Sequence, residues 1–181
     1  MKPESAVATI VAANALAARD ALARLLDDLA GVILHVPDDV YTAKPLPRVS
    51  GSIGQHVRHA LDHVAVLVTA RPHGVMTYDS RERGTAIETD QGAALRAILR
   101  LKPLLEAMTD DVLDSPVVLT SLLERDGTPE SARSTLRREL ASVIDHTVHH
   151  QALIATLLDV TGIGAPEAFG LAPSTPRPAH S

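Results

Sequence analysis

The stretch STLRRELASVIDHTVHHQALIATLLDVTG, residues 134–162, decides the fold of this chain. Its apolar residues recur at alternating steps of three and four, which is the spacing of one face of an α-helix. The glycine at its end is a common helix stop, so we expect one long helix from about residue 134 to residue 161. Histidines interrupt its apolar face, which reads Leu136, Leu140, Val143, His146, His150, Leu153, Leu157.

Three further helices are expected upstream. The first spans about residues 5–29, with a last turn that could reach residue 36. Three prolines follow and predict a connector. Either Ser50 or Ser52 can cap the second helix, which should run to about residue 70. The third should span residues 87–108, with a kink or break near Leu99 because Pro103 removes a backbone donor.

The segments between and after these helices carry turn signals. A short apolar run followed by Asp126-Gly127 predicts a small hairpin that pairs 117–124 with 129–134. We expect a single all-α domain over residues 1–162. The Pro-rich segment 163–181 is expected to form an extended C-terminal tail.

Composition excludes several classes of function. The 181 residues are 45% hydrophobic and 22% charged, which is typical of a globular domain. The chain has no cysteine, which excludes a disulfide framework, a thiolate zinc site and a cysteine nucleophile. With a formal net charge of -5 and no basic cluster, neither nucleic acid nor a membrane is an expected partner. Without a signal-peptide pattern or a spanning apolar run, we expect a cytoplasmic protein.

Histidines gather in two windows. On the second helix, His56, His59 and His63 share one face through steps of three and four, and His146 and His150 lie on the apolar face of the fourth. Burying one neutral imidazole without partners costs about 1–3 kcal/mol. Several imidazoles buried together therefore need a common partner, and a divalent metal ion accepts a lone pair from each ring.

The geometry favours a three-histidine site. His146 and His150 are four residues apart, so their rings lie over each other with about 6 Å of rise. A third imidazole from the second helix would leave a coordination position open, as in catalytic zinc sites. His56, His59 and His63 all remain candidates for that place. A zincin is not expected because no Glu follows His146, and a di-iron site would need Glu-x-x-His pairs.

Nearby residues are candidates for supporting roles. His56 and His63 are either alternative metal ligands or hydrogen-bond donors that support the ligand imidazoles. Asp62 and Asp145 could orient ligand imidazoles, although helix carboxylates are more often simply solvated. His149 lies about 100° around the helix from His150 and is expected to be a neighbour rather than a ligand.

The two histidine windows resemble motifs of the DinB/YfiT-like metal-binding four-helix bundles. His59 followed by Ala60-Leu61-Asp62 is similar to the second-helix motif of that family. His146-Thr147-Val148-His149-His150 is similar to its fourth-helix motif, whose first and fifth residues are ligands. The segments 78–90 and 169–175 resemble a subgroup of bacterial members. The resemblance implies a four-helix bundle whose ligands are His59, His146 and His150.

The family resemblance also implies a range of functions. Members bind zinc, nickel or similar ions, and several act on low-molecular-weight thiols as S-transferases or mycothiol-dependent isomerases. The expectation is one divalent ion, zinc or nickel, that activates a thiol co-substrate or water for a small-molecule substrate, in a chain that forms a homodimer. The alternatives are a metal-dependent hydrolase, a metal-binding or stress-response protein with a filled coordination shell, and a structural bundle with no metal.

Overall fold

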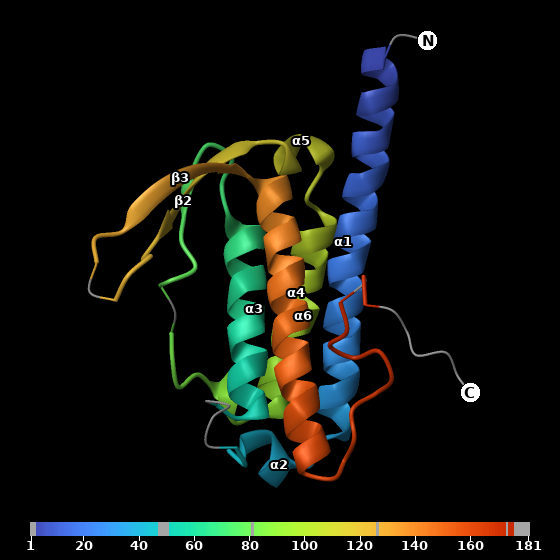
Figure 1. Ribbon diagram of the computed structural model, residues 1–181, viewed down its shortest axis with the longest axis vertical. Helices are drawn as coiled ribbons and strands as arrows, with labels where there is room; N and C mark the ends of the chain where they lie inside the picture. Colours follow the sequence, from blue (N-terminus) through green and yellow to red (C-terminus); the bar gives the residue numbers. More distant parts are fainter. Residues whose placement is uncertain (1–2, 47–50, 81, 126, 173, 176–181) are drawn as a thin grey trace.

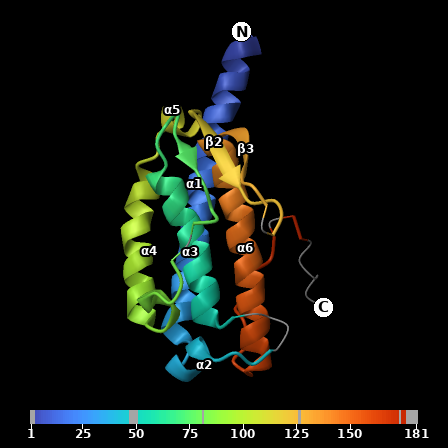
Figure 2. The ribbon, with the colours of Figure 1, turned by 90° about the vertical axis from the view of Figure 1, so that its left-hand side faces the viewer.

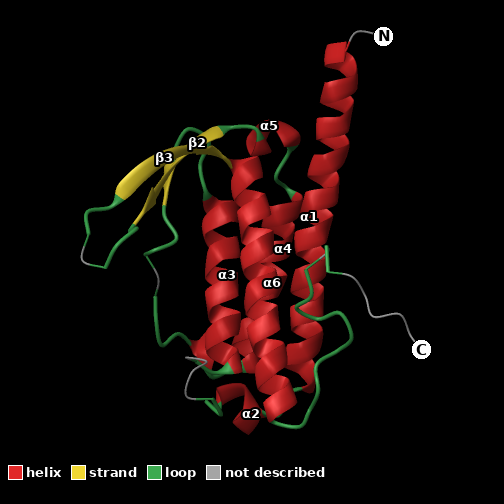
Figure 3. Ribbon diagram, viewed as in Figure 1, coloured by secondary structure: helices red, strands yellow, loops and turns green. Residues whose placement is uncertain are grey.

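The computed structural model describes residues 3–46, 51–80, 82–125, 127–172 and 174–175. They form a mostly helical protein with a small three-stranded sheet (Figure 3). The elements in chain order are α1 Pro3–His35, α2 Asp38–Thr42, α3 Ile53–Thr69, β1 Val75–Met76, the 3-10 turn η1 Ala86–Glu88, α4 Gln91–Glu106, α5 Asp110–Leu113, β2 Pro116–Ser121, β3 Glu130–Thr135 and α6 Leu136–Val160.

The four long helices α1, α3, α4 and α6 lie side by side around a shared apolar core (Figures 1 and 2). Each contributes fully buried side chains, such as Leu26 from α1, Leu67 from α3, Leu105 from α4 and Leu140 from α6. With very few aromatic residues, leucine, isoleucine, valine and alanine make up most of this core. None of the described helices is both long enough and apolar enough to cross a membrane.

Local signals account for the start of α3. The Ser52 hydroxyl accepts a hydrogen bond from the Gln55 backbone N–H at 3.2 Å, and the Gln55 side chain accepts one from the Ser52 N–H at 3.2 Å. This reciprocal capping box identifies Ser52 as the N-cap, one of the two serines that the sequence allowed.

The expected third helix is shorter than predicted and does not break. Residues 86–88 form the separate turn η1, and α4 then runs without interruption through Pro103. The helix tolerates Pro103 because the carbonyl that loses its partner belongs to Leu99, which is 70% exposed and lies where water can hydrate the backbone. The short α2 occupies part of the predicted connector.

The predicted hairpin forms, and a third strand joins it. β2 pairs antiparallel with β3 from Pro116 opposite Thr135 to Ser121 opposite Glu130. β1 adds in parallel to the other edge of β2, with Val75 opposite Val118. The two-residue β1 is too short to be recognised from hydrophobic alternation, since that pattern needs at least four residues.

The described part of the C-terminal tail packs against the helices. Phe169 is only 7% exposed and belongs to the apolar core. Gly170 has φ of +76° and lies so close to α6 that a Cβ would come within 2.6 Å of Ala152 Cα. The tail is therefore anchored by one aromatic side chain and one glycine, and residues 173 and 176–181 of the predicted tail lie outside the described residues.

Candidate metal centre

Helices α3 and α6 bring three imidazoles together. His59 of α3 and His146 and His150 of α6 each offer one ring nitrogen, and these three atoms all lie within 4.8 Å of one another. The ring of His59 is 4.9 Å from that of His146 and 4.5 Å from that of His150, measured between centroids. His150 is buried, whereas His59 and His146 are partly accessible. The group could hold one metal ion with a side open toward solvent.

His56 supports one member of this group. Its Nδ1 lies 3.0 Å from Nδ1 of His150, so one of the two nitrogens donates and the other accepts. Imidazoles that bind a metal usually pass their second ring N–H to an acceptor in this way. Because this contact uses Nδ1 of His150, its Nε2 is the nitrogen that can bind an ion. His56 would then support the ligand His150 through a hydrogen bond without binding the ion itself.

The protonation state of His150 suits metal binding. Burial, followed by the neighbouring rings of His146, His59, His56 and His149 in that order, lowers its pKa to about 2. Burial, with His149 next, also lowers the pKa of His56. Both imidazoles are thus neutral near pH 7 and have a lone pair available, as a metal ligand requires.

His63 lies beside the group rather than within it. Its Nδ1 donates to the His59 carbonyl at 3.0 Å, because a carbonyl can only accept. Its ring stacks on that of His146, with centroids 3.7 Å apart and planes 25° apart. The second-helix histidines therefore separate by position: His59 joins the three-histidine group, His56 hydrogen-bonds to His150, and His63 packs on His146.

The remaining candidates lie further out. His149 is exposed, and its ring centroid is 5.3 Å from that of His150 and 6.4 Å from that of His146. The Asp62 carboxylate pairs with Arg58, whose Nη1 lies 2.6 Å from Oδ2. Asp145 is exposed on α6. The Asp62 carboxylate thus binds Arg58, which lies one residue before the candidate ligand His59.

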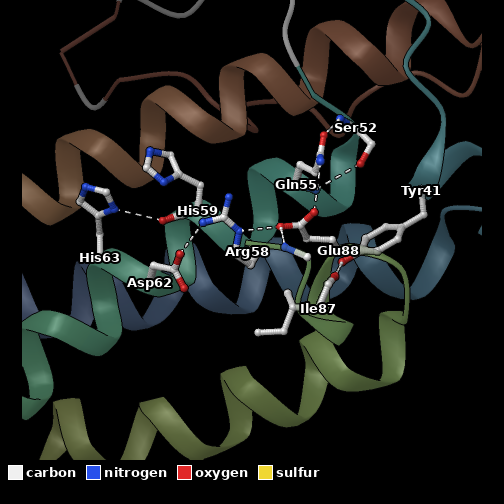
Figure 4. Close-up of polar contacts among 10 residues, drawn as sticks. Tyr41, Ser52, Gln55, Arg58, His59, Asp62, His63, Ile87 and Glu88 are labelled. Atoms are coloured by element: carbon white, nitrogen blue, oxygen red, sulfur yellow. Dashed lines mark hydrogen bonds and ion pairs between the residues drawn. The ribbon is translucent and has the colours of Figure 1, made fainter. Parts of the chain in front are cut away.

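Sequence reasoning missed a charged network that supports this part of α3 (Figure 4). Arg58 is 8% exposed and donates from Nε to Oε1 of Glu88 at 3.1 Å. Glu88 also accepts from the Gly84 N–H at 2.9 Å and from the Gln55 side chain at 3.1 Å. These bonds tie the segment 84–88 to α3. An arginine on the helix face next to a histidine window was the only sequence signal for it.

His56→Ala tests the supporting role of that histidine. We expect zinc affinity to fall by about 10–100-fold, because His150 would lose the acceptor that orients its ring. Isothermal titration with zinc at constant pH measures the loss. His35→Ala, which changes an exposed histidine at the end of α1, should leave the affinity unchanged. Equal affinities for the wild type and His56→Ala would contradict the role.

Glu88 should make stability depend on pH. Burial acts to raise its pKa, but hydrogen bonds from Gly84, Gln55 and Arg58 outweigh burial and hold the pKa below its usual value of 4.5. A carboxyl whose pKa is lowered by folding stabilises the protein above the unfolded-state pKa and loses that contribution as the pH falls through the folded-state pKa. Glu88→Gln should therefore destabilise the protein at pH 7, and the difference from wild type should shrink below about pH 4.5.

Urea unfolding of both proteins between pH 3 and pH 7 measures this difference. Glu106→Gln, at an exposed position at the end of α4, is the matched control and should change the free energy of unfolding little at any pH. A gap between wild type and Glu88→Gln that stays constant across this range would rule out the ionised Glu88 as the cause.

Comparison with known proteins gives one partial likeness. No family model matches the chain, and no solved structure matches it. FK506-binding protein 5 of Rhizopus delemar is 34% identical over 102 residues, which cover 56% of this chain and 26% of that protein. The chain thus spans about a quarter of the length of this curated relative, and the match leaves the family open.

Proposed function

We propose that this chain is a metal-binding protein of the DinB/YfiT-like kind, in which His59, His146 and His150 hold one divalent ion, zinc or nickel. The observation that carries the proposal is the convergence of three imidazole nitrogens within 4.8 Å of one another from two helices. The order of the helices supports it. The motif similar to the family's second-helix motif lies on α3, the second of the four long helices, and the motif similar to its fourth-helix motif lies on α6, the fourth. No nucleic acid or membrane is part of the proposal.

The proposed activity is a thiol S-transferase or a related metal-dependent reaction on a small molecule. A divalent ion with an open position lowers the pKa of a bound thiol or water and so supplies a nucleophile near neutral pH. The thiol would come from a low-molecular-weight co-substrate, because the chain has no cysteine.

The surrounding histidines have separable tasks in this proposal. His56 would hold the ring of His150 through the 3.0 Å contact between their Nδ1 atoms. The bond from His63 Nδ1 to the His59 carbonyl assigns the proton of His63 to Nδ1. Its Nε2 then carries the lone pair and could take a proton from the thiol. Homodimer formation is a separate proposal, carried by the family resemblance.

One observation favours the non-catalytic alternative. The ring of His63 is 4.7 Å from that of His59 and 3.7 Å from that of His146, so a fourth imidazole is adjacent to the group. If His63 turned toward the ion, the coordination shell would be filled. The protein would then bind metal without turning over a substrate.

The experiment has two steps. Metal analysis of the purified protein should give about one zinc or nickel per chain. The metal-loaded and chelator-stripped proteins are then compared for consumption of a thiol in the presence of 1-chloro-2,4-dinitrobenzene, with thiol binding to the cobalt(II) form followed by its charge-transfer absorption. Protein without stoichiometric metal would refute the metal site. Metal without thiol binding or turnover would favour the filled shell.

A further inference from the structure

The loop after β1 brings a tyrosine to the candidate metal centre. In Figures 1 and 2 the segments 77–80 and 82–85 run along the outer side of α3. Near the start of the first segment, the ring of Tyr78 stacks on the ring of His63, with centroids 4.7 Å apart and planes only 7° apart. His63 in turn stacks on His146 at 3.7 Å. Tyr78, His63 and His146 therefore form a continuous stack of three rings that ends on a candidate metal ligand.

The hydroxyl end of Tyr78 meets a buried acid of α6. Glu139 is 0% exposed, and its Oε1 accepts from the Ser134 hydroxyl at 2.5 Å and from Arg138 at 3.0 Å. Tyr78 Oη and Glu139 Oε2 are both buried, and neither makes a hydrogen bond to any of the described residues. Burial, followed by the charge of the nearby Glu139, raises the pKa of Tyr78. The phenol thus keeps its proton beside this acid.

A second contact holds the same loop. The backbone N–H of Leu122, just after β2, donates to Oδ2 of Asp79 at 2.7 Å. The residue next to Tyr78 is therefore attached to the sheet, while the ring of Tyr78 itself is stacked on His63. With both attachments in place, the tyrosine ring has little freedom to move away from His63.

We propose that Tyr78 is a positioning residue for the three-histidine site, acting on His146 through the ring of His63. This inference rests on the proposed function, since it assigns a support to the same metal ligands. A ring that is stacked on one side and bound to the metal on the other loses little rotational freedom when the ion binds. The same stack holds the ring of His63 in place between Tyr78 and His146.

Three variants and one control test the role. Tyr78→Leu removes the stack, Tyr78→Phe keeps the ring and removes the hydroxyl, and Glu139→Gln removes the charge. We expect Tyr78→Leu to weaken zinc binding by about tenfold or more, which is the effect of losing a support behind a ligand. Tyr78→Phe should lose less zinc affinity than Tyr78→Leu, because its ring can still stack on His63. Tyr41→Phe is the matched control, since Tyr41 is also buried and donates to the Ile87 carbonyl at 2.8 Å.

The visible spectrum of the cobalt(II)-loaded protein separates positioning from simple stability. Tyr78→Leu should change the position or intensity of the ligand-field bands, whereas Tyr41→Phe should lower the Tm and leave the bands unchanged. Wild-type affinity and spectrum in Tyr78→Leu would overturn the inference and leave the proposed function standing. A wild type that binds no metal would instead refute the proposed function. If Tyr78→Leu does not fold, Tyr78→Met takes its place, because it also removes the ring, and a wild-type affinity and spectrum in that variant would overturn the inference.

Discussion

Replacing His146 and His150 together with alanine is expected to abolish stoichiometric metal binding while α6 stays folded. The two imidazoles are two of the three nitrogens within 4.8 Å of one another, and only His59 would remain. Zinc binds structural sites with a free energy of about 10–16 kcal/mol, to which every ligand contributes. Removing two of the three imidazole ligands should therefore lower the zinc affinity by at least roughly a thousand-fold. Metal analysis after purification, and zinc titration of the stripped protein, measure the loss.

His149→Ala is the matched control for the double variant. It removes an imidazole from the same turn of α6, but this ring is exposed and lies 6.4 Å from His146. Its zinc content should equal that of the wild type. Far-ultraviolet circular dichroism checks that both variants keep their helices, because alanine favours helix at either position.

Thermal unfolding provides a second measure of the same prediction. A ligand that binds only the folded protein stabilises it by about 2.7 kcal/mol at a concentration one hundred times its Kd. Added zinc should therefore raise the Tm of the wild type and of His149→Ala, and leave that of the double variant unchanged. Equal zinc-dependent shifts in all three proteins would contradict the assignment of His146 and His150 as ligands.

Gly54→Ala is expected to destabilise the protein by about 3 kcal/mol, because it overpacks a close contact between α3 and the segment 84–88. A Cβ at this position would lie 2.6 Å from Cε1 of Tyr41 and 2.8 Å from the carbonyl carbon of Glu88, with the Glu88 oxygen nearer still. The Glu88 backbone cannot move away without breaking the bonds that Glu88 makes with Arg58 and Gln55. Urea unfolding at neutral pH measures the effect.

Gly31→Ala is the control with the opposite expected sign. Gly31 also lies inside a long helix, but a Cβ there would meet no atom within 4 Å. The substitution should stabilise the protein by up to about 1 kcal/mol, which is the ordinary gain when alanine replaces glycine inside a helix. If Gly54→Ala stabilised the protein as Gly31→Ala should, the segment 84–88 could not be packed on α3 as described.

Much of the fold was predictable because the signals are local. Helical periodicity located α6 within a residue or two, and a serine at position 50 or 52 was predicted to cap α3, which Ser52 does. The turn at Asp126-Gly127 predicted the hairpin of β2 and β3. The shorter α4 was missed because an uninterrupted helical pattern hides the separate turn η1, and the continuity at Pro103 depends on hydration of an exposed helix face.

The sequence by itself determined that five histidines face the interior from two helices, because the spacing of residues along a helix sets the direction of each side chain. It left open which of His56, His59 and His63 would meet His146 and His150. Only the tertiary structure decided this, since the axial offset between α3 and α6 selects His59. The contacts of Arg58 with Glu88 and of Tyr78 with His63 were likewise decided by tertiary packing, because they join segments that no local pattern connects.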